Sequence, residues 1–159
     1  MPIRNNTTKT EIDNVVSMMI ERFHRALIRQ MCYIGERCLK AARSTNTYKD
    51  QTGNLRSSIG YVVVEDGTIV QMSSFDVVKQ GQQGKQQGRS FVLDLIDEFP
   101  KGIVLIVVAG MNYAAYVEAK GKDVIEGSEL LAEKLVPEML RKLGIEPGSL
   151  EDALKDFYI

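Results

Sequence analysis

The chain has 159 residues and a mass of 17.8 kDa, a size at which a single domain buries a core without a metal or a disulfide. Hydrophobic residues make up 44% of it and charged residues 26%, which is ordinary for a globular protein and excludes a wholly disordered chain. Its 20 basic and 21 acidic residues leave a formal net charge of −1, so the net charge does not demand a polyanionic partner.

The sequence has no pattern of a membrane span or a secretion signal. The longest apolar run, 103–110, is far shorter than the roughly 20 residues that a transmembrane helix needs. The largely polar residues 1–6 lack the apolar stretch of a signal peptide. We therefore expect one soluble domain over residues 1–159, in the cytoplasm and without membrane contact.

Two cysteines and one histidine limit the chemistry that the chain offers. Cys32 and Cys38 do not have CxxC spacing, and in a helix their thiols lie on offset faces. His24 has no Ser or Cys nucleophile pattern beside it. The sequence predicts unpaired thiols, no catalytic residue, no metal, no cofactor and no small-molecule substrate.

The first expected element is a long amphipathic helix over residues 8–44. Thr8 and Glu11 fit a capping box, in which each side chain satisfies a free amide of the first turn. Apolar residues then recur at helical spacing without an interrupting proline. They are Ile12, Val15, Val16, Met19, Phe23, Leu27, Met31, Ile34, Cys38 and Ala41.

The same helix carries basic residues within about 120° of its circumference. They are Arg22, Arg25, Arg29, Arg37, Lys40 and Arg43. One interpretation is an ordinary solvated face. The other is a surface for an acidic partner chain or for nucleic-acid phosphate, with transient DNA contact that weakens as salt rises.

Residues 50–59 are expected to carry the chain from the helix into the sheet. Thr52 can cap a short helical turn, and Gly53 permits a close backbone approach. Leu55 can pack against the long helix, and the Arg56 guanidinium suits a carboxylate or backbone carbonyls. A β-hairpin over 59–72 follows, in which Asp66-Gly67 predicts a two-residue type I′ turn.

Residues 73–90 are expected to form a mobile insertion loop. The Gln/Gly/Lys tract 79–88 contains no apolar residue to offset the cost of ordering it. It would either order on assembly or be a tolerated surface insertion, and it has no phosphate-binding pattern. The apolar stretch 91–99 predicts a short helix ended by Pro100.

The last part of the chain predicts one strand and several helices. Residues 103–109 are apolar on both faces, which is typical of a central, covered strand. A short helix over 112–121 would be capped by Asn112 and stopped by Gly121. A helix over 128–143 would be kinked or split at Pro137.

The tail 149–159 ends in apolar residues, so it would either pack on its own fold or enter a groove of a neighbour. Its acidic residues Glu151, Asp152 and Asp156 complement the basic face of the first helix. Altogether the sequence predicts an α+β fold. Its long N-terminal helix packs on a small antiparallel sheet of three or four strands, with short C-terminal helices.

Two stretches resemble a known family. They are Asp-Gln-Thr-Gly-Asn-Leu-Arg-Ser-Ser-Ile at 50–59 and Asn-Tyr-Ala-Ala-Tyr-Val-Glu-Ala-Lys-Gly at 112–121, followed by a helix near 130–140. In this order they resemble the gene-10-like tail-component family of long-tailed bacteriophages and prophages, over residues 10–143. The chain departs from that pattern at 118–121, where the family usually has Glu, one residue and Gly. It also departs in the Gln/Gly tract 79–88 with the segment 91–99, and after Gly144.

The resemblance implies a virion subunit and not an enzyme. Such proteins assemble as rings, often hexamers, at the head–tail junction or at the end of the tail tube, after synthesis in the host cytoplasm. The expected partners are copies of the chain and other neck or tail proteins. The motif positions implied in architecture or assembly are Thr52, Gly53, Leu55, Arg56, Ser58, Tyr113, Tyr116, Glu118 and Gly121.

Two rival functions are weighed against this one. The first is a small nucleic-acid-binding module that uses the basic face of the first helix. The second is a small enzyme that holds a metal with Asp94, Asp97 and Glu98. Asp97 and Glu98 point to different sides of one short helix, which is poor geometry for a metal site.

Overall fold

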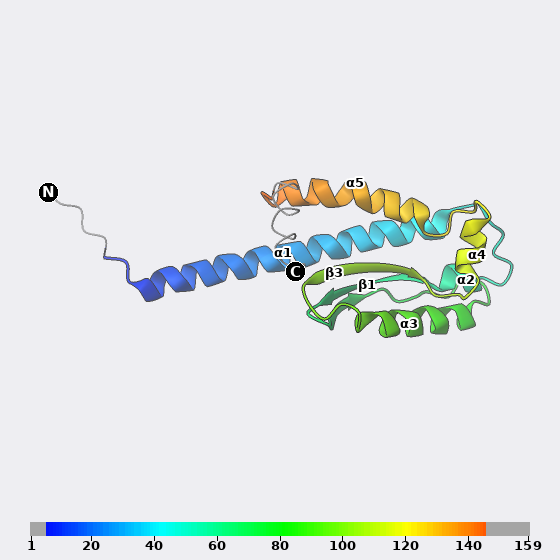
Figure 1. Cartoon of the computed structure of the whole chain (residues 1–159), viewed down its shortest axis with the longest axis horizontal. Coiled ribbons are helices and arrows are strands. Elements are labelled where there is room, and N and C mark those ends of the chain that lie inside the picture. Colours follow the sequence, from blue (N-terminus) through cyan, green and yellow to red (C-terminus); the bar gives the residue numbers. More distant parts are fainter. Residues whose placement is uncertain (1–5, 146–159) are drawn as a thin grey trace.

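The computed structural model describes residues 6–145 and has the α+β architecture that the sequence predicts. In chain order its elements are α1 (Lys9–Ser44), α2 (Asn54–Ser57), β1 (Ile59–Glu65), β2 (Thr68–Met72), α3 (Gln82–Ile96), β3 (Ile103–Ala109), α4 (Ala114–Ala119) and α5 (Glu126–Lys142). A three-stranded antiparallel sheet lies between α1 and α3, and α5 packs along α1 (Figure 1).

Helix α1 starts as its capping residues predict. The Glu11 amide donates to Thr8 Oγ1 at 3.3 Å, and the Thr8 amide donates to Glu11 Oε2 at 2.8 Å. The capping box therefore satisfies two amides that a helix start otherwise leaves free.

The hairpin is also confirmed. Glu65 pairs with Thr68, and the two residues between them have positive φ, 46° at Asp66 and 74° at Gly67, as a type I′ turn requires. The pairing slips by one residue between Val63 and Val64, which leaves a bulge on β2.

The prediction that residues 103–109 form a central strand is wrong for this chain. The strand order is β2-β1-β3, so β1 is central and β3 lies at an edge. The apolar pattern of β3 reflects cover on both faces. Leu105 and Val107 pack toward α1 and α5, whereas Ile106 and Val108 pack toward α3.

The prediction of a mobile loop over 73–90 is also wrong, because residues 82–90 belong to α3. Gly84 and Gly88 are buried where α3 meets α2 and the start of β1. Phe75, only 1% exposed, packs between β1 and α3. Glycines stand at these positions because the α3 backbone itself contacts α2 and the start of β1. A side chain at either glycine would hold the two backbones apart.

The C-terminal helices differ in detail from expectation. Asn112 does not cap α4, whose N-cap is Tyr113, but Gly121 does adopt a left-handed φ of 70°. Helix α5 begins at Glu126 and continues through Pro137 as one helix rather than two. Its apolar side chains on both sides of Pro137 pack on α1, which holds the two halves together. The predicted tail 149–159 lies outside the described residues.

Candidate assembly surfaces

The 50–59 motif is a node where α1, the sheet and α3 meet. Its centre is the buried carboxylate of Asp50, which accepts hydrogen bonds from the amides of Gly53 at 3.0 Å and Arg56 at 3.1 Å. Thr52 Oγ1 accepts the Asn54 amide at 3.3 Å, so it caps the turn more weakly than Asp50 does. The loop therefore has one fixed shape before β1 begins.

The other motif residues connect this node to its surroundings. Arg56 donates to the Thr45 carbonyl at 2.6 Å and stacks over the Tyr48 ring, which ties the node to the end of α1. Leu55 is buried against Leu39 and Ala42 of α1. Ser58 Oγ donates to the Leu55 carbonyl at 2.7 Å. Arg56, Leu55 and Ser58 all contact other parts of the same chain. They therefore hold the fold together and are not a surface for a partner.

Gly53 meets two separate constraints. Its φ is 82°, and an added Cβ would lie 1.9 Å from the Val78 carbonyl oxygen. The segment before α3 therefore lies directly on the node. Ser57 Oγ reinforces this contact by accepting the Val78 amide at 2.8 Å.

The second motif holds the start of α5 through one side chain. Glu118 Oε1 accepts the amides of Ile125 at 3.0 Å and Glu126 at 2.7 Å, and a carboxylate is favourable at a helix N-terminus. Tyr113 and Tyr116 are exposed, and Lys120 lies over the Tyr116 ring. The partial burial of the Tyr113 side chain, together with the nearby Asp50 carboxylate, raises its pKa. The two tyrosines, unlike Glu118, are available to a partner.

The basic face is largely exposed. Arg22, Arg25, Arg29, Arg37 and Lys40 are exposed along α1. Arg43 differs, because its side chain is only 17% exposed, donates to the Ile59 carbonyl at 2.9 Å and pairs with Asp76. Burial lowers the pKa of Arg43. Arg43 therefore belongs to the contact between α1 and the sheet and is not part of the exposed basic face.

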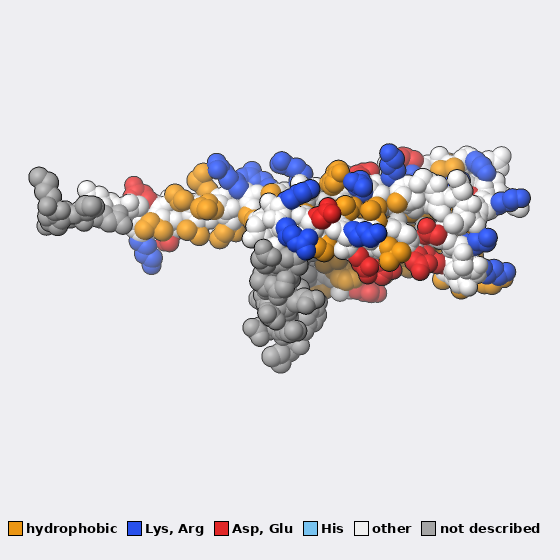
Figure 2. Space-filling model, turned by 90° about the horizontal axis from the view of Figure 1, so that it is seen from above, with side chains coloured by type: hydrophobic (Ala, Val, Ile, Leu, Met, Phe, Trp, Pro, Cys, Tyr) orange, Lys and Arg blue, Asp and Glu red, His pale blue; other side chains and the backbone are white. Residues whose placement is uncertain are grey.

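The N-terminal part of α1 projects away from the rest of the molecule. We call residues 9–23 the arm. All of them are exposed, and hydrophobic side chains lie along it (Figure 2). The large hydrophobic residues, 39–64% exposed, are Ile12, Val15, Val16, Met18, Met19, Ile20 and Phe23.

The apolar stripe of the arm continues a surface that α5 covers further along. Leu27, Met31, Ile34 and Cys38 of α1 pack against α5. Ile12, Val16 and Phe23 fall on the same side of the helix at 100° per residue. The arm therefore presents half of a helix-packing interface whose other half is absent from residues 6–145.

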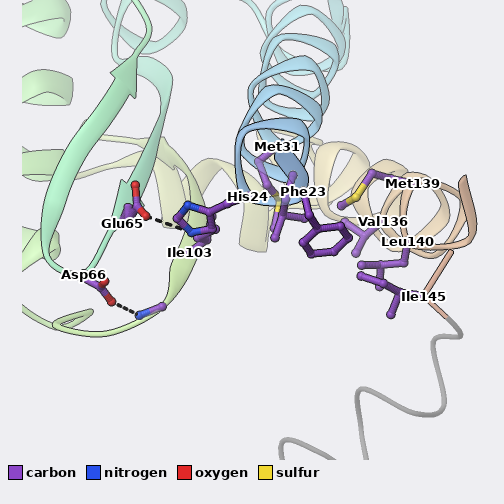
Figure 3. Close-up of a pocket in the computed structure, with 12 residues that line it drawn as sticks. Phe23, His24, Met31, Glu65, Asp66, Ile103, Val136, Met139, Leu140 and Ile145 are labelled. Carbon is purple, nitrogen blue, oxygen red and sulfur yellow. Dashed lines mark hydrogen bonds and ion pairs between the residues drawn. The ribbon is translucent and has the colours of Figure 1, made fainter. Parts of the chain in front are cut away.

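A cavity of about 500 Å³ lies where the arm leaves the body. Phe23, Met31, Val136 and Leu140 point into it from α1 and α5 (Figure 3). At its rim His24 Nε2 lies 3.0 Å from Glu65 Oε1, which joins α1, one residue past the arm, to the end of β1. The apolar lining suits a hydrophobic side chain better than a charged substrate.

The two cysteines and the three acidic residues Asp94, Asp97 and Glu98 are the other reactive side chains that the sequence singles out. Cys32 and Cys38 are free, and burial raises the pKa of both thiols. Within residues 6–145 no group of acidic, His or Cys side chains could hold a metal ion, so Asp94, Asp97 and Glu98 do not form such a group. In the same part of the chain no helix is long and apolar enough to span a membrane.

Several residues that build these surfaces were missed from the sequence. The sequence places Asp50 in a motif but does not identify it as the hydrogen-bonding centre of that motif. The composition of the tract predicts Gly81, Gly84 and Gly88 to be loop residues, although their spacing of three and four places them on one face of a helix. That spacing is the signal that could have revealed α3.

Comparison of the chain with protein-family models, curated proteins and solved structures finds no match. The family resemblance therefore depends on the two motifs and on the helix near 130–140 that follows them.

Proposed function

We propose that this chain is a structural subunit of a tailed bacteriophage or prophage. It acts at the head–tail junction or at the end of the tail tube, by assembling into a ring with copies of itself. The place in the particle follows from the resemblance of the 50–59 and 112–121 motifs to tail components. The self-assembly is supported by an observation in the structure.

That observation is the uncovered apolar stripe of the arm. A helix of about 15 residues without tertiary contacts is marginal in water, and most helical stability comes from packing an apolar face. Exposed patches of this kind mark interaction sites. The arm has a capped N-terminus and continues directly into the rest of α1, so its helix is already formed for packing against another molecule. In the proposed ring that molecule is a neighbouring copy.

The proposal is tested by measuring the mass of the purified chain over a range of concentrations, alone and with the candidate tail tube protein. We expect multiples of 17.8 kDa that correspond to a closed ring. The variants Val16→Glu and Met19→Glu put a charge into the apolar stripe and should shift the mass toward one chain. The controls Asn14→Glu and Ser17→Glu add the same charge on the other side of the arm and should assemble normally.

A chain that stays monomeric at every concentration, and also with the tube protein, would contradict the proposal. The neighbouring genes give an independent check, since genes for a portal, a capsid protein and a tube protein should lie nearby.

A second candidate function is nucleic-acid binding, which the exposed basic residues favour. Each phosphate that is neutralised on duplex DNA steepens the fall of log K with log salt by about 0.9. Arg25→Gln and Arg29→Gln should therefore weaken binding and flatten its salt dependence, whereas Lys134→Gln on α5 should not. The absence of DNA binding at low salt would remove this candidate.

A further inference from the structure

Strand β3 combines the sequence of a central strand with the position of an edge strand. All seven of its residues are apolar, and helices cover both of its faces. Within residues 6–145 only β1 pairs with it. A strand covered on both faces is typical of the interior of a sheet.

The outer edge of β3 presents a regular row of backbone groups with which no other strand within residues 6–145 pairs. The Gly110 amide donates to the Ser58 carbonyl, and the Asp66 amide donates to the Gly102 carbonyl, at the two ends of the β1–β3 pairing. Alternation in an antiparallel pair then directs the backbone groups of Val104, Ile106 and Val108 toward β1. Those of Ile103, Leu105, Val107 and Ala109 point outward.

Apart from the bulge on β2, the edge strands of this sheet lack the residues that commonly block pairing. Edge strands are normally blunted by charged residues, by proline or by a short length. Neither β3 nor β2 contains a charged residue or a proline, and β3 runs for seven residues in unbroken register with β1. The bulge on β2 bends that strand but leaves it exposed, with Ile69 and Val70 at its surface.

We propose that β3 of one copy pairs with β2 of the next copy, so that the sheets of neighbouring subunits join into one. The chain itself supplies both edges, and this pairing occupies both of them. Head-to-tail contact between two different edges is the type of interface that closes into a ring. This inference rests on the proposed function for the assumption that the assembly is a ring. The surface that it uses, the two sheet edges, is separate from the arm.

The direction of the pairing follows from the topology. Strands β2 and β3 both run antiparallel to β1, so within one copy they are parallel to each other. A rotation about a ring axis that continues the sheet keeps this common direction. The contact between β3 and β2 of the neighbour is therefore parallel, whereas a two-fold contact between two β3 strands would be antiparallel.

Blocking one edge at a time tests the pairing. Val104→Lys adds a charge to half-buried β3, and Ile69→Lys adds one to exposed β2. Val77→Lys is the matched control, since Val77 is exposed and lies outside the strands. We expect each edge variant alone to have the mass of one chain and the control to assemble like the unchanged protein.

The decisive measurement is an equal mixture of the two edge variants. Val104→Lys keeps an intact β2 edge and Ile69→Lys keeps an intact β3 edge, so the mixture should form a dimer that grows no further. Dimers of Ile69→Lys alone would instead mean contact between two β3 strands and would overturn the proposal.

The failure of this inference is distinct from that of the proposed function. If both edge variants form the same ring as the unchanged chain, the strand pairing is wrong and ring assembly stands. If the unchanged chain never assembles, both are wrong.

A cross-linking measurement covers the case in which Val104→Lys does not fold. Chains carrying Val104→Cys are mixed with chains carrying Ile69→Cys and treated with a short bismaleimide. We expect cross-linked dimers in the mixture above the level that Cys32 and Cys38 give in the unchanged chain. Dimers from Val104→Cys alone, or none in the mixture, would refute parallel β3–β2 pairing.

Discussion

The ring of Tyr61 lies directly against Gly35, so the central strand approaches the C-terminal half of α1 at a point where the helix has no side chain. A Cβ added to Gly35 would lie 2.5 Å from Tyr61 Cδ2. The Tyr61 hydroxyl also donates to Glu36 Oε1 at 2.7 Å, which fixes the ring in place. Burial, together with this hydrogen bond to a carboxylate, raises the pKa of Tyr61.

We expect Gly35→Ala to destabilise the protein, although alanine is the better helix former. The gain in helix propensity is about 1 kcal/mol, whereas overpacking a core typically costs about 1–3 kcal/mol. Urea unfolding measures the balance. In a Tyr61→Leu background, where the ring is absent, Gly35→Ala should cost less. A more stable Gly35→Ala protein would show that the ring is free to move aside.

Asp50→Ala should unfold the motif node. Loss of the carboxylate leaves the amides of Gly53 and Arg56 without their acceptor, and an unsatisfied buried group costs about 1–3 kcal/mol. Asp50→Asn retains one acceptor oxygen and should cost less. The control Asp13→Asn changes an exposed carboxylate of α1 and should leave the melting temperature nearly unchanged. Equal effects at both positions would argue against a special role for Asp50.

Gly84→Ala distinguishes a packed helix from the mobile loop that the sequence predicts. An added Cβ would lie 1.9 Å from the Asn54 carbonyl oxygen, which is backbone and moves only with the node. We expect clear destabilisation in thermal unfolding. Gln83→Ala, at the exposed position beside it, should have little effect or be slightly stabilising. A mobile segment would tolerate both changes equally.

The capping box makes the start of the arm sensitive to acid. Hydrogen bonds from the Thr8 amide and hydroxyl lower the pKa of Glu11 from its ordinary value of 4.5. The folded state therefore favours the ionised carboxylate, and its stabilisation is present above pH 4.5 and lost as the pH falls through the lower folded value. Amide exchange in the first turn of α1 should quicken over that range.

Glu11→Gln should remove most of this pH dependence, whereas Glu21→Gln, further along the arm, should keep it. The expectation fails if exchange in the first turn has the same pH profile in all three proteins.

The elements that the sequence determined by itself are those whose signals are local. The capping box at Thr8, the apolar period of α1 and the Asp66-Gly67 turn each act through residues within a few positions of one another, so their structures follow without knowledge of the fold. The motif positions were found for the same reason, because Gly53 and Leu55 stand in a short, recognisable run.

Two features depend on the tertiary structure and not on local sequence, namely the backbone contacts of α3 and the edge position of β3. Helix α3 forms because Gly84 and Gly88 let it approach α2 and β1. A pattern of apolar side chains does not predict this contact, because it is made by backbone where side chains are absent. The edge position of β3 likewise depends on strand order, which hydrophobicity does not specify. Both faces of β3 are covered whether or not a further strand lies beside it, so its sequence reads as central in either case.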